Sequence, residues 1–178
     1  MRKGEAAALQ WSDIDLEEGT IYIRKTLDFS AKGEEELLGE TKTFKSKRKI
    51  TISQSLIKNL TFHIQWQDQN KATLKDTYNY ELNLVLCRPN GDFMPKSSLF
   101  NAFSRILKQA KLPRLPIHSL RHTHAVLLLE AGADMKYIQE RLGHGSMQIT
   151  ADVYSHISKK IESETMNKYE NYMKGILD

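Results

Sequence analysis

The sequence predicts an α+β protein that is mainly α-helical, with a small three-stranded antiparallel sheet near the amino terminus. Apolar residues recur at helical spacing in 53–74, 95–112 and 117–130. β-branched residues instead alternate with polar ones in 20–27 and 48–52. A length of 178 residues with 40% hydrophobic residues is enough for one compact domain with a real core, 1–178.

The chain begins with an alanine-rich helical pattern in 1–9 and turns at Glu18-Gly19. This abrupt start suggests a piece of a longer protein, and Arg2 would lie where a terminus tends to fray. Segments 20–27, 41–43 and 48–52 are the expected strands, with a polar excursion through Gly33 and Gly39 after the first. The last two strands would be joined by a basic turn that places Lys42 near its tip.

Basic residues are concentrated in this turn, although the net charge is only +4. The basic run is Lys42, Lys45, Lys47, Arg48 and Lys49, and it follows the acidic residues Glu34, Glu35, Glu36 and Glu40. Such a run is usually a solvated face, so alone it is modest support for a nucleic-acid partner.

Several helix boundaries are marked by capping residues. Ser53 or Ser55 can cap the first long helix, and Pro95 starts another that stops before Pro113. Between them, 82–87 is a short buried strand or extended segment. Asp134 caps a helix over 135–142, which Gly143 ends.

Beyond Gly143 the pattern predicts two further helices. Ser146 can cap a short one through Val153, and 157–178 forms an amphipathic tail that docks on a partner or lies on its own core.

The segment 117–124 opens a strongly apolar helix that would be buried on most faces, yet its first turn carries basic groups. His118 and Arg121 are three residues apart and would share a helix face near the positive end of the dipole, which suits a phosphate. The simplest alternative is a core helix with a polar end. A second is zinc binding, because His118 and His122 have the spacing of paired ligands, but Ser119 stands where a zincin-type helix needs Glu.

The single cysteine, Cys87, cannot form an internal disulfide and suits a reducing compartment. No signal peptide is visible, and the apolar runs are too short to span a bilayer. These features predict a soluble, cytoplasmic protein.

Five motifs in order resemble those of the tyrosine recombinases, the phage and conjugative-transposon integrase family. They are Arg2-Lys3-Gly4-Glu5, Thr41-Lys42-Thr43, His118-Ser119-Leu120-Arg121-His122-Thr123, Leu142-Gly143-His144 and Ala151-Asp152-Val153-Tyr154-Ser155-His156. Each is common by chance, but all five in this order within one small domain are not. The resemblance implies the catalytic-domain fold of that family.

The resemblance implies strand cleavage in double-stranded DNA without metal, ATP or another cofactor. Tyr154 would attack a phosphodiester to form a 3′-phosphotyrosine link, and His118 would accept its proton. Arg2 and Arg121 would hold the non-bridging oxygens, with His144 as a further donor.

Lys42 would protonate the departing 5′-oxygen, although Lys45 and Lys47 lie close enough in sequence to take that role. Glu5, one turn from Arg2, could orient it by pairing, or be an ordinary surface carboxylate.

Family members normally carry an amino-terminal arm and a core-binding domain, which are absent from this sequence. The chain should therefore bind DNA weakly and with little sequence preference. Its basic run should make that binding strongly salt-dependent, because each phosphate contact releases counterions. A tetramer on DNA and a monomer without it are the family expectation.

Rival functions are a type IB topoisomerase, a DNA-binding regulator without catalysis, and a metallohydrolase that uses His118, His122 and His144. The compact boxes and closing helix favour the recombinase over the topoisomerase. The regulator is disfavoured because every proposed catalytic position is filled, and the metallohydrolase because few acidic or cysteine ligands accompany the histidines.

Overall fold

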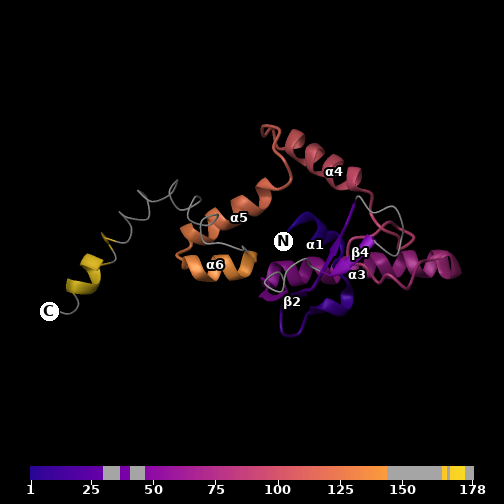
Figure 1. The fold of residues 1–178 in the computed structure, drawn as a ribbon, viewed down its shortest axis with the longest axis horizontal. Helices are drawn as coiled ribbons and strands as arrows, with labels where there is room; N and C mark the ends of the chain where they lie inside the picture. Colours follow the sequence, from indigo (N-terminus) through magenta and orange to yellow (C-terminus); the bar gives the residue numbers. More distant parts are fainter. Residues whose placement is uncertain (30–36, 41–46, 144–165, 168, 175–178) are drawn as a thin grey trace. The chain divides into compact units, whose positions relative to one another are not determined.

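A computed structural model describes residues 1–29, 37–40, 47–143, 166–167 and 169–174. The chain divides into two compact units, 1–119 and 120–178 (Figure 1). The predicted fold class is confirmed: long helices accompany a small antiparallel sheet.

The first unit contains a three-stranded antiparallel sheet with β2 (Thr20–Ile23) at its centre. One neighbour is β1 (Ile14–Asp15) and the other is β5 (Arg48–Thr51), which pairs Ile23 with Arg48. The predicted three-stranded sheet is therefore present, but β1 is its third strand. The strand expected at 41–43 lies outside the described residues.

The prediction of one continuous strand over 20–27 is wrong. The strand breaks at Arg24, whose side chain forms an ion pair with the buried carboxylate of Asp13. After the break, β3 (Lys25–Leu27) pairs with a different strand, β4 (Leu38–Glu40), which the sequence analysis assigned to a polar excursion. The alternation of β-branched and polar residues continues through Arg24. It therefore does not predict that β2 and β3 pair with different strands.

Helix α3 (Gln54–Leu74) packs its apolar face against the sheet. The predicted cap at Ser53 is confirmed, because Ser53 Oγ accepts a hydrogen bond from the backbone N–H of Leu56 at 3.3 Å. The buried core that includes residues of the sheet and of α3 consists of Leu9, Ile21, Ile23, Ile52, Leu60 and Val85. Trp66, also on α3, is 40% exposed.

The segment 82–87 is neither a strand nor continuously extended: it bends, Asn83 has φ +44°, and only Leu84 and Cys87 make isolated bridges. Leu84, Val85 and Cys87 are buried. The buried amide of Gln67 joins this segment to α3. Its oxygen accepts from Trp11 Nε1 at 2.6 Å, and its nitrogen donates to the carbonyl oxygens of Leu84 and Val85, each at 3.1 Å. These bonds satisfy a polar group that would otherwise be costly to bury.

Helix α1 (Lys3–Ala7) lies directly against β3 because Gly4 has no side chain. A Cβ at Gly4 would fall 2.5 Å from Thr26 Oγ1 and 2.9 Å from the carbonyl oxygen of Leu27. The close approach at Gly4 therefore brings the backbone that carries Glu5 directly against this strand.

The first unit closes with α4 (Lys96–Gln109), which begins after Pro95 and ends before Pro113 as predicted. Its Leu107 is buried, while the neighbouring Ile106 is exposed. Near its start, the ammonium group of Lys3 lies 5.5 Å from the ring centroid of Phe100.

The second unit is built on two helices, α5 (Ser119–Glu130) and α6 (Met135–Leu142). Both predicted boundaries of α6 are confirmed. Asp134 accepts a hydrogen bond from the backbone N–H of Tyr137 at 2.8 Å, and Gly143 ends the helix with φ +66°. The shared core consists of Ala125, Leu129, Ile138 and Leu142.

Burial of α5 on most faces was expected, but the helix buries a single stripe. Arg121, Ala125 and Leu129 follow one another at four-residue spacing, whereas Leu120 and Leu127 are exposed. In the tail, 166–167 and 169–174 are helical, and the short helix predicted from Ser146 lies outside the described residues. Within the described ranges, every helix is too short or too polar to traverse a lipid bilayer.

Candidate functional site

Arg2 is held by Glu5 at the start of α1. The backbone N–H of Arg2 donates to Glu5 Oε2 at 2.7 Å, and its Nη1 donates to Oε1 at 2.8 Å. The Arg2 side chain is 41% exposed, while that of Glu5 is only 2% exposed. The pairing of Glu5 with Arg2 that the sequence suggested is therefore present, and the alternative of an ordinary surface carboxylate is wrong.

Glu5 also contacts a second guanidinium group. Arg48 Nη1 donates to Oε1 at 3.2 Å and Nη2 donates to Oε2 at 2.8 Å, and both residues are buried. Burial alone would raise the pKa of Glu5, but hydrogen bonds from Arg48 and Arg2 and the charge of Arg48 outweigh it and lower the pKa to about 2. Glu5 is thus a carboxylate fixed in its charged form.

We expect Glu5 to make stability dependent on pH. Because its folded pKa of about 2 lies below the ordinary value of 4.5, the contribution is complete above that value and is lost as pH falls towards 2. At about 1.4 kcal/mol per pKa unit, the full contribution is about 3 kcal/mol. Urea unfolding of wild type and Glu5→Gln should therefore give free energies of unfolding that differ most near neutral pH and converge in acid.

The matched control is Glu17→Gln, because Glu17 is exposed in the turn before β2. Its free energy of unfolding should stay close to that of wild type at every pH. A Glu5→Gln difference that did not change with pH would show that the Glu5 charge has no special role in the folded state.

The burial of Arg48 was not predicted from the sequence, where it is one of five basic residues in a run interpreted as solvated. A signal was available, because Arg48, Ile50 and Ile52 have the same parity and β5 alternates between the two sheet faces. Arg48 and Ile52 are buried and Ile50 is half-buried, whereas Lys49 and Thr51 are exposed.

His118 and Arg121 were expected to share the first turn of one helix, but α5 begins one residue after His118. His118 lies in a turn in which the backbone N–H of Ser119 donates to the carbonyl oxygen of Pro116 at 2.9 Å. His118 is exposed, whereas Arg121 is 6% exposed. The helix starts late because this proline-containing turn supplies the hydrogen bond that precedes it.

Arg121 is anchored to the end of α6. Its Nη2 donates to the carbonyl oxygen of Leu142, one of the last carbonyls of that helix, where a positive charge is favourable. Leu142 directly precedes Gly143, so this contact joins the Arg121 motif to the first residue of the next predicted motif, Leu142-Gly143-His144.

His124, one turn after Arg121, packs α5 against α6. Arg141 Nε donates to His124 Nε2 at 3.2 Å, so this ring nitrogen acts as the acceptor. Burial, followed by the nearby charge of Arg141, lowers the pKa of His124. Both effects favour the neutral form of His124, which lies where α5 and α6 contact each other.

The remaining predicted site residues, Lys42, His144 and Tyr154, lie outside the described residues, as does Lys45. Lys47 is described and is half-buried just before β5. Of the predicted set, the structure thus describes Arg2 in the first unit, His118 at its end and Arg121 in the second.

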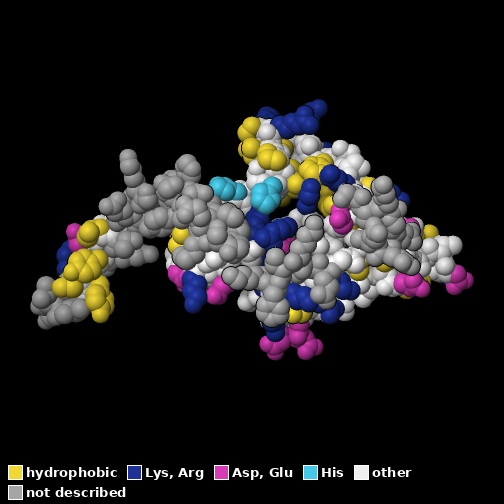
Figure 2. All heavy atoms as spheres, in the orientation of Figure 1, with side chains coloured by type: hydrophobic (Ala, Val, Ile, Leu, Met, Phe, Trp, Pro, Cys, Tyr) yellow, Lys and Arg dark blue, Asp and Glu magenta, His cyan; other side chains and the backbone are white. Residues whose placement is uncertain are grey.

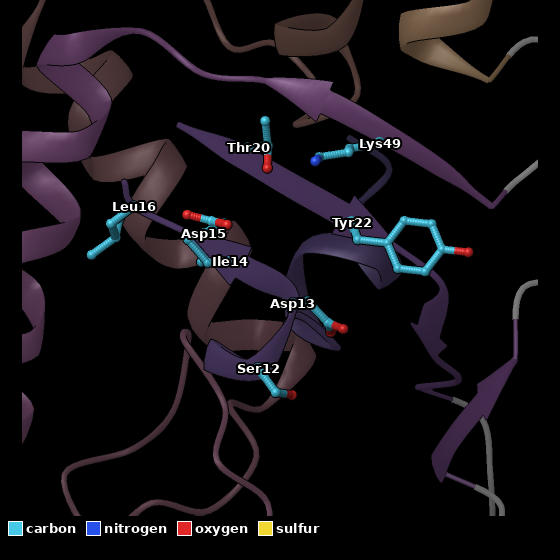
Figure 3. Close-up of a pocket in the computed structure, with 8 residues that line it drawn as sticks. All are labelled: Ser12, Asp13, Ile14, Asp15, Leu16, Thr20, Tyr22 and Lys49. Carbon is cyan, nitrogen blue, oxygen red and sulfur yellow. The ribbon is translucent and has the colours of Figure 1, made fainter. Parts of the chain in front are cut away.

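A surface pocket of the first unit contains none of these residues. It lies beside β1 and β2 and is lined by Ser12, Asp13, Ile14, Asp15, Leu16, Thr20, Tyr22 and Lys49 (Figure 3). Tyr22 and Lys49 are directly paired across β2 and β5. Figure 2 shows Lys and Arg side chains on several parts of the visible face of this unit, so its basic groups are not confined to one point.

The chain is similar to known proteins in both sequence and fold. The model of the phage integrase family matches residues 1–160. The chain is 31% identical over 94% of its length to the tyrosine recombinase XerC-like protein of Caldanaerobacter subterraneus subsp. tengcongensis, and 29% identical over 97% to the ICEBs1 integrase of Bacillus subtilis. It covers 46% of each relative and so spans about half the length of these proteins.

The fold is similar to that of the Tn1549 transposon integrase, solved in complex with transposon right end DNA. The TM-score is 0.73 at 21% sequence identity, over 94% of this chain and 54% of that one. Fold and sequence match together over most of the chain. The chain belongs to the phage integrase family, the tyrosine recombinases.

Proposed function

We propose that this chain is the catalytic part of a site-specific recombinase that cuts and rejoins double-stranded DNA through Tyr154. The single observation that best supports the proposal is the Arg2–Glu5 pair, because a buried carboxylate orients an arginine that remains partly exposed. Such an arginine suits an oxygen of a phosphodiester. Family membership supplies the reaction class.

In the proposed cleavage step, the phenolic oxygen of Tyr154 forms a bond to phosphorus and the 5′-oxygen leaves. The phenol has a pKa of about 10, so its proton must pass to a neighbour, here His118. Lys42 donates a proton to the departing 5′-oxygen, with Lys45 or Lys47 as the alternative donor. A 5′-hydroxyl from another strand then attacks phosphorus and releases Tyr154.

Charge stabilisation falls to Arg2, Arg121 and His144. Negative charge grows on the non-bridging oxygens as phosphorus becomes five-coordinate, and guanidinium groups match these oxygens in two-pronged geometry. The anchoring of Arg2 by Glu5 and of Arg121 by the Leu142 carbonyl supports this role, because groups that are already positioned need not reorganise during the reaction.

The remaining parts of the proposal concern assembly. Residues 1–178 form the catalytic domain, which acts as a homotetramer on DNA and is a monomer without it. Exposed Met166, Tyr169 and Tyr172 in the tail 157–178 support a docking role for that segment. The basic run that includes Lys47 and Lys49 supports DNA binding that falls steeply with salt, because each phosphate contact releases counterions.

The experiment that tests the proposal is incubation of the chain with a nicked suicide duplex, from which the short fragment that carries the new 5′-hydroxyl is lost after cleavage. A denaturing gel should show a covalent protein–DNA adduct, and protease digestion with mass spectrometry should place the DNA 3′-phosphate on the peptide that contains Tyr154. Duplex bound at saturation without an adduct would favour a non-catalytic DNA-binding regulator. An adduct accompanied only by relaxation of supercoils, without strand exchange, would favour a topoisomerase.

A further inference from the structure

Arg48 and Arg2 belong to different parts of the first unit and both donate hydrogen bonds to the Glu5 carboxylate. Arg2 lies at the start of α1, Arg48 is the first residue of β5, and Glu5 accepts hydrogen bonds from both. Each carboxylate oxygen of Glu5 therefore contacts both arginines, Oε1 through the two side chains and Oε2 through the Arg2 backbone and Arg48 Nη2.

The two arginines differ in what else they can reach. The side chain of Arg48 is 7% exposed, against 41% for Arg2. Arg48 is also fixed at its backbone by pairing with Ile23 in the sheet. Both Nη atoms of Arg48 donate to Glu5, so its planar fork is already occupied by that carboxylate, whereas the side chain of the neighbouring Lys49 is exposed.

A carboxylate held only by Arg2 would be a weak support, because Arg2 precedes a helix of only five residues and lies three residues from Glu5. The two-pronged contact from Arg48 removes rotation of the Glu5 carboxylate and ties it to the sheet. The same contact joins α1 to the strand that follows the segment containing Lys42 in sequence.

We propose that Arg48 is a positioning residue for strand cleavage. It fixes the orientation of the Glu5 carboxylate, and Glu5 in turn orients the Arg2 side chain toward the scissile phosphate. This inference rests on the proposed function, since it assigns a role within that reaction. Arg48 acts through another residue and does not touch DNA.

The test compares Arg48→Met and Arg48→Lys in the full chain with the nicked suicide duplex at saturating concentration. Misplacing a catalytic group by about 1 Å can cost about 10²-fold in rate, so Arg48→Met should slow adduct formation by about 10- to 100-fold. Arg48→Lys, which keeps the charge but loses the planar fork, should recover part of this loss. The dissociation constant for DNA should change by less than about twofold, because each lost phosphate contact would instead weaken binding measurably.

The matched control is Arg24→Met, because Arg24 also pairs with a buried carboxylate of the first unit, that of Asp13. Both variants should lose stability in urea unfolding, but only Arg48→Met should lose cleavage rate. A double-mutant cycle adds a readout that stability does not move. In an Arg2→Lys background, Arg48→Met should have little further effect, because residues acting through one group are not additive.

The outcomes separate the inference from the proposed function. No Tyr154-linked adduct with wild type overturns both. A normal adduct with wild type but equal rates for wild type and Arg48→Met overturns the inference alone. Equal slowing by Arg24→Met, additive losses in the Arg2→Lys background, or a large change in DNA affinity would also overturn it.

Discussion

Tyr154→Phe is expected to abolish the covalent protein–DNA adduct completely. Phenylalanine lacks the phenolic oxygen that forms the bond to phosphorus, so the variant has no nucleophile at this position. The ring remains, so DNA affinity should stay within about twofold of wild type, since no phosphate contact is lost. The adduct is measured on a denaturing gel with the nicked suicide duplex, and affinity is measured by fluorescence anisotropy.

Tyr80→Phe is the matched control, because Tyr80 is 53% exposed and loses the same hydroxyl. It should form the adduct at the wild-type rate. If Tyr154→Phe still formed the adduct, another residue would be the nucleophile and the proposed mechanism would fail.

Arg121→Lys is expected to lower the rate of adduct formation at saturating DNA by about 10²- to 10³-fold, the usual cost of losing one positioned donor to a developing oxyanion. Lysine keeps the positive charge but cannot contact the Leu142 carbonyl and a phosphate oxygen through one planar fork. The loss should therefore appear in the rate rather than in DNA affinity. Single-turnover kinetics with the suicide duplex, together with anisotropy, separate the two quantities.

Arg141→Lys controls for general damage to the second unit. Arg141 contacts His124 and Tyr137 from α6, so its replacement disturbs the same pair of helices. This variant should cleave at close to the wild-type rate. Equal losses for Arg121→Lys and Arg141→Lys would show that the effect reflects packing of α5 on α6.

Helix boundaries were predictable where one residue decides them. Ser53 and Asp134 cap their helices through a single side-chain oxygen, and Gly143 adopts a left-handed conformation that other residues resist. Strand pairing was less predictable. The alternation of polar and apolar residues indicates that 25–27 is a strand, but it does not indicate that this strand pairs with β4. The third strand, β1, is only two residues long, so it carries no usable pattern.

The candidate site was partly predictable for a similar reason. The Arg2–Glu5 pair is local, three residues apart, and the sequence suggested it. The contact of Glu5 with Arg48 spans 43 residues and depends on which face of β5 lies inward. The charge pattern alone indicated a solvated basic run, so it did not predict that Arg48 is buried. Lys42, His144 and Tyr154 were named through resemblance to a family, and their roles stay predictions.

The fixed charge of Glu5 limits how kinetic titrations of this protein can be interpreted. Because its pKa is about 2, Glu5 neither gains nor loses a proton in any buffer that leaves duplex DNA intact. An inflection in a pH–rate profile near neutrality therefore reports another ionisable group, and a buffer series can be used to search for the general base without correcting for this carboxylate.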